Sequence, residues 1–171
     1  MVAGFRAGQN LVELASDVAL ETADDLFLGQ AFGGAAFAEA AGRLGVTPIE
    51  EITDYTGEEG ARVTRRLLAS AEPPTAIVYD NDIMAVAGLS VAAEMGVPVP
   101  GRLSIVAWDD SVLCRLVHPP LTAVSLDIPA YGARVARHLA DLAAGHAVES
   151  ACHATALLAP RGSTSAPPNQ W

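Results

Sequence analysis

The sequence predicts an α/β protein in which helices flank a parallel sheet. Short apolar runs rich in β-branched residues alternate with longer segments whose apolar residues recur at helical spacing. Clusters of Gly, Pro and Asp separate these segments, as turns do. The chain has 171 residues, of which 51% are hydrophobic and 18% charged. That length and composition suit one domain with a buried core and are too apolar for a disordered chain.

The first part of the chain is expected to contain two strands and two helices. The strands are residues 10–16 and 49–53. The first helix is expected from residue 24 or 25 to residue 44, because acids stand at its start and Gly45 follows its end. Thr56 and Glu59 have the spacing of a capping box, in which each side chain accepts the other residue's amide N–H. A second helix therefore begins there and runs to about Ser70.

The rest of the chain continues the alternation. Strands are expected at residues 75–79, 103–107, 121–125 and 155–159, and helices at residues 83–95 and 129–144. Gly96 closes the first of these helices. Val135, Leu139 and Leu142 give the second an apolar stripe. The Ser/Pro-rich residues 163–171 are expected to form a flexible tail.

Charge excludes several functions. The net charge is -10, and all ten basic residues are arginines because there is no lysine. A phosphate-binding P-loop and a Schiff-base enzyme both need a lysine, and an acidic chain does not suit nucleic acid. Arg62, Arg65 and Arg66 do cluster, but a solvated helix face explains them better than a phosphate contact.

The two cysteines and the N-terminal residues indicate the cellular compartment of the protein. Cys114 and Cys152 are too few for a disulfide framework and lack CxxC spacing, so free buried thiols are expected. The first residues contain no sustained apolar run of the signal-peptide kind. We therefore expect a cytoplasmic protein.

Three polar sets follow expected strands, where ligands bind in open parallel sheets. They are Asp54-Tyr55, Asp80-Asn81-Asp82 and Trp108-Asp109-Asp110. Carboxylates and an amide exchange hydrogen bonds with hydroxyls, and aromatic rings offer flat apolar faces. This mixture favours a small neutral ligand, sugar-like or nucleoside-like.

These sets also have alternative interpretations. Any of the three residues after Tyr79 can cap the helix that follows, Tyr79 and Trp108 can be packed hydrophobes, and Asp110 can be a loop hydrogen-bonder. The acid pairs also resemble a Mg²⁺-dependent phosphotransfer site, against which the missing lysine weighs. No Gly-x-Ser-x-Gly is present, and no histidine, His118 included, has an evident nucleophile partner. We expect no catalytic residue, no metal and no cofactor.

From Pro74 onward, a series of motifs resembles the LacI/GalR family of transcription regulators. In order they are Pro74-Thr75-Ala76-Ile77, Asn81-Asp82-Ile83-Met84-Ala85, Gly96-Val97-Pro98-Val99-Pro100, Leu103-Ser104-Ile105-Val106, Trp108-Asp109-Asp110, Pro119-Pro120-Leu121-Thr122 and Arg161-Gly162-Ser163-Thr164. A weaker resemblance continues upstream through residues 33–42 and 54–60. The resemblance implies a periplasmic-binding-protein-like (type I) fold whose two lobes close on an effector.

The same resemblance implies which side chains bind that effector. They are Gln30, Tyr55, Asn81, Asp109, Leu126 and Ile128, with Asp82, Trp108 and Asp110 as possible accessories. The family commonly has arginine at position 30 and often glutamine at position 126. Glutamine at the first position makes an anionic effector less favourable, and leucine at the second makes the pocket more apolar.

The resemblance also predicts domains and partners. Residues 1–162 correspond mostly to the C-terminal subdomain of the effector-binding domain, and the helix at 129–144 crosses to an N-terminal lobe that is absent here. We expect a homodimer that buries this helix, and operator DNA binding only through a helix-turn-helix domain outside this chain. The predicted function is therefore effector sensing and dimerisation within a regulator rather than catalysis. The alternatives are a solute-binding protein of transport, with no membrane-embedded part, or a Mg²⁺-dependent enzyme.

Overall fold

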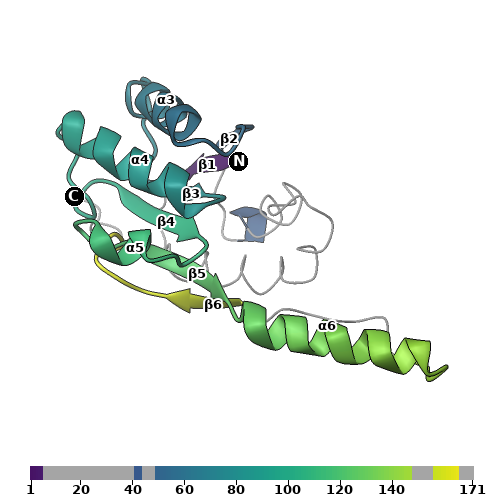
Figure 1. Ribbon diagram of the computed structural model, residues 1–171. Coiled ribbons are helices and arrows are strands. Elements are labelled where there is room, and N and C mark those ends of the chain that lie inside the picture. The colour runs from purple at the N-terminus through teal and green to yellow at the C-terminus, as the bar shows by residue number, and fades with distance from the viewer. Residues whose placement is uncertain (6–40, 44–48, 148–155, 166–171) are drawn as a thin grey trace.

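The computed structural model describes residues 1–5, 41–43, 49–147 and 156–165 (Figure 1). Its described strands form one six-stranded sheet in the order β2-β1-β3-β4-β5-β6. They are β1 Val2–Phe5, β2 Ile49–Glu51, β3 Ala76–Tyr79, β4 Ser104–Trp108, β5 Thr122–Leu126 and β6 Ala156–Ala159. The predicted α/β class is confirmed, and five of these strands coincide with expected ones to within two residues.

The prediction of a parallel sheet is only partly correct. β3, β4 and β5 pair in parallel, as strands linked by helical crossovers do. β1 runs antiparallel to both β2 and β3, and β6 runs antiparallel to β5. The last pairing follows from register: Ala156 lies opposite Leu126 at the carboxyl end of β5, so β6 starts there and runs back.

Four helices have both ends within the described residues: α3 Gly57–Leu68, α4 Asp82–Glu94, α5 Leu113–Leu116 and α6 Ile128–Ala143. α3 packs against α4, and α4 packs on β3 and β4. The two helices approach closely at Gly60, where an added Cβ would lie 2.8 Å from the Cβ of Met84. This packing places the start of α4 beside the ends of the central strands.

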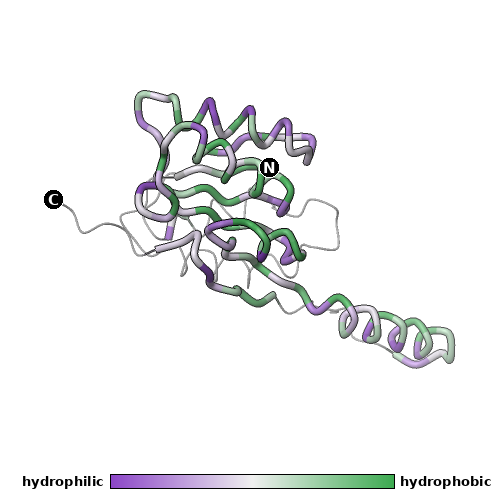
Figure 2. The backbone as a smooth tube through the Cα atoms, turned by 60° about the vertical axis from the view of Figure 1, so that its left-hand side comes forward, coloured by the Kyte–Doolittle hydropathy of each residue, from purple (hydrophilic) through white to green (hydrophobic). Residues whose placement is uncertain are grey.

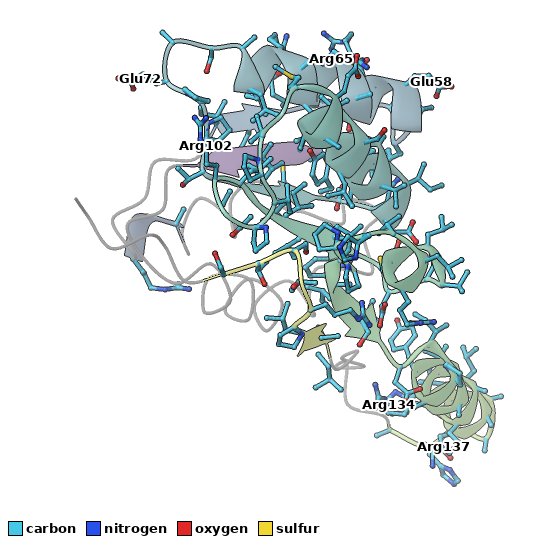
Figure 3. All side chains as sticks on the ribbon, turned by 90° about the vertical axis from the view of Figure 1, so that its left-hand side faces the viewer. Glu58, Arg65, Glu72, Arg102, Arg134 and Arg137 are labelled. Atoms are coloured by element: carbon cyan, nitrogen blue, oxygen red, sulfur yellow. The ribbon has the colours of Figure 1, made fainter. Side chains whose placement is uncertain are left out.

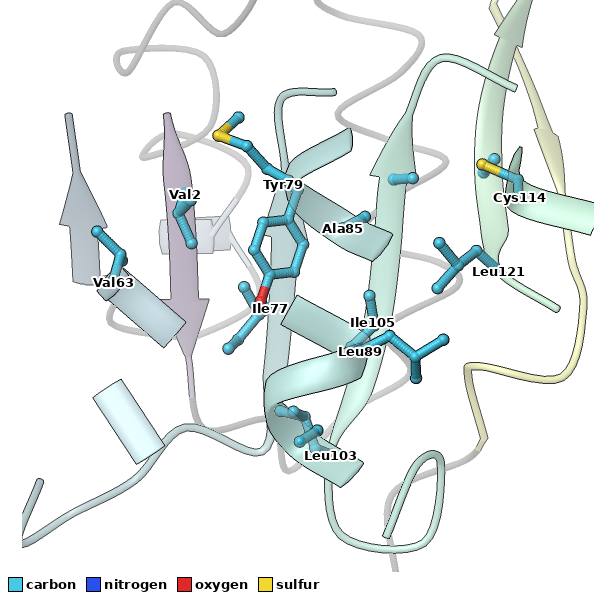
Figure 4. Close-up of a cluster of buried hydrophobic side chains, with 14 of the residues drawn as sticks. Val2, Val63, Ile77, Tyr79, Ala85, Leu89, Leu103, Ile105, Cys114 and Leu121 are labelled. Carbon is cyan, nitrogen blue, oxygen red and sulfur yellow. The ribbon is translucent and has the colours of Figure 1, made fainter. Parts of the chain in front are cut away.

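The central strands, β1 and helices α3 and α4 enclose the core (Figure 4). Tyr79 is fully buried at its centre, and its hydroxyl lies 2.7 Å from the Thr64 hydroxyl in α3. Burial raises the pKa of Tyr79. Trp108 is 2% exposed. Both aromatics therefore pack inside, as one of the two interpretations from sequence predicts.

α3 begins as predicted, but its capping box is only half formed. The Thr56 hydroxyl accepts from the Glu59 amide at 3.2 Å. The Glu59 carboxylate instead accepts from Arg62, and the Thr56 amide donates to Asp54 at 3.1 Å. An ionised partner within reach binds the glutamate more strongly than a neutral amide does. The second half of the predicted box is therefore wrong.

The arginines of α3 lie on a solvated face, as predicted. Their side chains are about half exposed, and they pair with Glu59, Glu94 and Glu51 (Figure 3 labels Arg65). Each arginine thus already has an acidic partner within the chain.

α6 extends away from the sheet (Figures 1 and 2). Asp127 caps its start, where its carboxylate accepts from the Ala130 amide at 2.9 Å. No residue of α6 is buried, and Leu139 and Leu142 are 61% and 57% exposed. The stripe expected from sequence thus lies open to solvent.

Several predictions fall wholly or partly outside the described residues. These are the strand at 10–16, most of the helix at 24–44, of which 41–43 are described as helical, Gln30, Cys152 and the tail from residue 166. Cys114 is a buried free thiol, as expected. β1 and α5 are present but were not predicted.

Candidate functional site

The candidate site lies at one edge of the sheet, where β2, β3 and β4 end. β2 and β3 both run antiparallel to β1 and therefore share a direction, which β4 also follows. Their carboxyl ends thus point to the same edge. Tyr55 follows β2, Asn81 follows β3 and Asp109 follows β4. The fold therefore brings together three of the side chains predicted to bind an effector.

Asn81 joins two of these loops. Its side-chain oxygen accepts from the Met84 amide at 2.8 Å and so caps α4. Its amide nitrogen donates to the backbone oxygen of Tyr55 at 2.9 Å. Of the three residues that the sequence offers as a cap for this helix, the structure uses Asn81. One donor and one acceptor site remain on its amide for a ligand.

Tyr55 and Asp109 share an unusual backbone conformation. Their φ angles are 68° and 69°, and they are the non-glycine residues with positive φ among those described. Such strain gathers at functional sites, where surrounding contacts hold it in place. Tyr55 is 45% exposed, and Asp109 is exposed. Both side chains are therefore available at the edge.

Three acids interact electrostatically at this edge. The Asp80 side chain is 1% exposed, and its Oδ2 accepts from the Met1 amino group at 3.3 Å. Burial raises the pKa of Asp80, against the opposing effects of the Met1 charge and the Tyr55 hydroxyl. Partial desolvation of its carboxyl group also raises the pKa of Asp109, and the charges of Asp82 and Asp80 add to this. Asp109 thus lies within the field of the other two acids.

Sequence reasoning did not include Asp80 among the site residues. It placed the residue in one of the three polar sets at this edge, with a helix cap or an acid pair as alternatives. The available signal was its position, an acid placed directly after a strand that is buried along its whole length.

Asp110 has a structural role. Its carboxylate accepts from Arg161 at 2.7 Å and pairs with Arg115 at 3.2 Å. Arg161 also donates to the backbone oxygen of Leu121 at 2.7 Å. These bonds tie the loop after β4 to the start of β5. Asp110 is thus held by arginines rather than left free for a ligand.

The other predicted site residues differ in where the structure places them. Leu126 is half-buried at the end of β5, and Ile128 is 58% exposed at the start of α6. Trp108 is buried in the core. Asp82 is buried in the first turn of α4. Gln30 lies outside the described residues.

The described residues contain neither a metal-binding group of side chains nor a membrane-spanning helix. In the described part of the chain, no three His, Cys, Asp or Glu side chains are placed to hold a metal ion. None of the described helices is long and apolar enough to cross a membrane. The acid pairs therefore gain no support as a Mg²⁺ site.

Comparison with known proteins adds independent information. Residues 29–164 match the periplasmic binding protein-like domain family. The HTH-type transcriptional regulator DegA of Bacillus subtilis is 33% identical over 135 residues, which cover 76% of this chain and 40% of DegA.

Solved structures agree with this match. A LacI family transcriptional regulator from Bifidobacterium animalis is 38% identical, with a TM-score of 0.77, over 90% of this chain and 62% of that one. A lac repressor dimer bound to operator and the anti-inducer ONPF is 27% identical, with a TM-score of 0.68, over 76% and 46%. This chain thus spans less than two thirds of each of these proteins.

Proposed function

This chain belongs to the periplasmic binding protein-like domain family of LacI/GalR transcription regulators, and we propose that it is the effector-sensing and dimerising part of such a regulator. The relatives compared are transcription regulators rather than enzymes. Reading of operator DNA is assigned to a helix-turn-helix domain outside this chain. A protein that acts on bacterial DNA works in the cytoplasm, and we extend that location to this one.

One observation carries the proposal: Tyr55, Asn81 and Asp109 meet at the carboxyl edge of the sheet. An aromatic ring, an amide and a carboxylate together match a polyhydroxylated or heterocyclic small molecule. Both strained backbone positions lie in this set, which supports a ligand-binding role rather than a role in packing alone. Gln30, Leu126 and Ile128 complete the proposed effector site.

Transport is the competing function for this fold. A solute-binding protein would hold its ligand at the same edge, so the site itself does not separate the two. The regulators among the compared proteins favour sensing. The homodimer belongs to the same proposal, and the lac repressor structure is itself a dimer.

A thermal-shift screen tests ligand binding by this chain. Sugars and nucleosides are added one at a time, because a ligand that binds only the folded state raises Tm with concentration. At least one is expected to raise Tm in the native chain and less so in Asp109→Asn. Glu94→Gln, which changes an exposed acid at the last residue of α4, is the control and should respond like the native chain.

The remaining outcomes count against the proposal. A response to Mg²⁺ alone would favour the enzyme instead. Silence across the screen would show that this chain senses no sugar or nucleoside. Tight, sequence-specific binding of operator DNA by this chain in a gel-shift assay would overturn the assignment of DNA reading to another domain.

A further inference from the structure

An open apolar groove lies at the amino edge of the sheet, at the other end of the strands from the candidate site. α4 connects the parallel strands β3 and β4, so its last residues lie where these strands begin. The groove has a volume of about 280 Å³ and lies between the end of α4 and the loops before β4 and β5. Its lining is apolar except for His118, and Leu89, Ala93, Val97 and Val99 contribute to it.

The last described residues lead towards this groove. The sequence predicts a flexible tail from residue 163, but Ser163 is fully buried, and its hydroxyl donates to the Ile105 carbonyl at 2.6 Å. The Ser165 hydroxyl then donates to the Pro100 carbonyl at 3.4 Å. Pro100 follows the groove residue Pro98 by two positions. The described part of the chain therefore ends close to the groove.

The next segment of the sequence has the reach and the composition to fill it. Residues 166–171 are Ala-Pro-Pro-Asn-Gln-Trp and lie outside the described residues. Six extended residues span about 20 Å, which is more than the distance that two residues can cover between Pro98 and Pro100. Prolines stiffen a segment and so lower the entropy that it loses on binding, and a tryptophan ring gains much from leaving water.

We propose that residues 166–171 bind in this groove of the same chain, with the ring of Trp171 against Val97 and Val99. The apolar lining suits the faces of the ring. An indole N–H is a donor only, and the neutral imidazole of His118 offers an acceptor for it. The groove lies away from the candidate effector site, so this docking goes beyond the proposed sensing function.

NMR of the full chain tests the docking. The chain has two tryptophans, Trp108 and Trp171, and the indole signal that Trp171→Ala removes identifies the second. We expect nuclear Overhauser effects between the Trp171 ring and the methyl groups of Val97 and Val99. Ala93→Arg places a long charged side chain in the groove from an exposed position and is expected to abolish these effects.

A matched variant and a second measurement support the test. Ala133→Arg adds the same side chain to an exposed alanine of α6, which does not line the groove, and should retain the effects. Urea unfolding gives the second measurement. Trp171→Ala is expected to lower the urea midpoint of the native chain, and to leave that of Ala93→Arg unchanged because the groove is already blocked there.

Three results would overturn the proposal. The native chain could show no effect between Trp171 and the groove, or the effects could persist in Ala93→Arg. Trp171→Ala could also lower the urea midpoint equally in both backgrounds, which would place the ring on another surface. A mixture of ¹³C-labelled and unlabelled chains separates the remaining occupant. Effects that arise only between molecules would assign the groove to the segment of a second copy and overturn docking within one chain.

Discussion

Tyr79 reaches beneath α4 because residue 88 of that helix is a glycine. A Cβ at Gly88 would lie 2.0 Å from the Tyr79 hydroxyl oxygen and 2.4 Å from the ring carbon that bears it. The space is filled instead by the phenol, which bonds to Thr64 of α3. One missing methyl group thus lets the side chain of a central strand link two helices.

Gly88→Ala is therefore expected to destabilise the chain by about 2–4 kcal/mol, because the buried ring cannot move away without strain. Gly132→Ala is the matched control: an added Cβ in α6 meets nothing within 4 Å, and alanine stabilises a helix by about 0.5–1 kcal/mol over glycine. Urea unfolding measures both. Equal midpoints for the two variants would contradict this account of the packing.

The raised pKa values of Asp80 and Asp109 predict how stability changes with pH. An acid whose pKa is higher in the folded state binds its proton more tightly there. Its contribution to stability is therefore present below the unfolded pKa, near 3.8, and is lost as pH rises through the folded value. We expect Asp80→Asn to gain stability relative to the native chain near pH 7 and to lose that advantage as pH falls towards 4.

Urea midpoints measured from pH 7 to pH 4 check this expectation. Asp54 and Glu59 act in the opposite direction, since hydrogen bonds lower both pKa values. They are common to both proteins and cancel in the difference. A difference between Asp80→Asn and the native chain that stays constant with pH would show that the Asp80 pKa is not raised.

Position in the sequence predicted which residues lie at the candidate site, but not the contacts that these residues make. Asn81 and Asp109 could be placed because polar residues after parallel strands meet at one edge. The two hydrogen bonds of Asn81 and the pairing of Asp110 with Arg161 could not be predicted, because both require segments that are distant in the sequence to lie close together. Asp80 was placed in a polar set at this edge but not among the binding residues, and its burial could not be predicted because it depends on packing that a one-dimensional pattern does not record.

At the scale of elements, local signals explain which predictions succeeded. The central strands and α4 carry apolar runs bounded by turn residues, so pattern alone locates them. β1 has four residues and α5 also four, too few for a periodicity to show. The antiparallel pairings of β1 and β6 are set by tertiary contacts.

The start of α3 provides a test of the half-formed capping box. Thr56→Ala removes the side-chain acceptor of the Glu59 amide and is expected to cost about 1 kcal/mol, whereas Thr56→Ser retains the cap. Glu59→Ala should cost less than Thr56→Ala, because the Glu59 carboxylate does not accept from the Thr56 amide and loses only an exposed pair with Arg62. Thermal unfolding measures all three. A larger loss in Glu59→Ala than in Thr56→Ala would restore the full capping box.

Arg161 joins three elements and has a larger expected effect. Arg161→Met removes bonds to Asp110 and to the Leu121 carbonyl from a side chain that is 18% exposed. We expect the free energy of unfolding to fall by about 2–3 kcal/mol, because removal of the guanidinium group leaves the Leu121 carbonyl and one Asp110 oxygen without this partner. Arg62→Met, which breaks an exposed pair, is the control and should change little.

A double-mutant cycle separates the two bonds of Arg161. If Asp110 accounts for much of the effect, Arg161→Met will cost clearly less in an Asp110→Asn background than in the native chain. Additive losses would show that the ion pair contributes nothing and that the Leu121 carbonyl is the main partner.

At the scale of the whole molecule, α6 differs from the other long helices. α3 and α4 each bury one side against the fold, while α6 has no buried residue. Leu139 and Leu142 lie on its apolar stripe, and burying a leucine side chain contributes about 1.5–3 kcal/mol. An open stripe of this kind favours association.

The proposed homodimer follows from that open stripe. We expect the chain to sediment as a dimer at micromolar concentration, and Leu139→Glu to convert it into a monomer, because a charge would be buried in the interface. Ala133→Glu places the same charge on the opposite face of α6 and should leave the dimer intact. A native chain that remains a stable monomer at that concentration contradicts the proposal. A dimer that both variants preserve would place the interface on a surface other than α6.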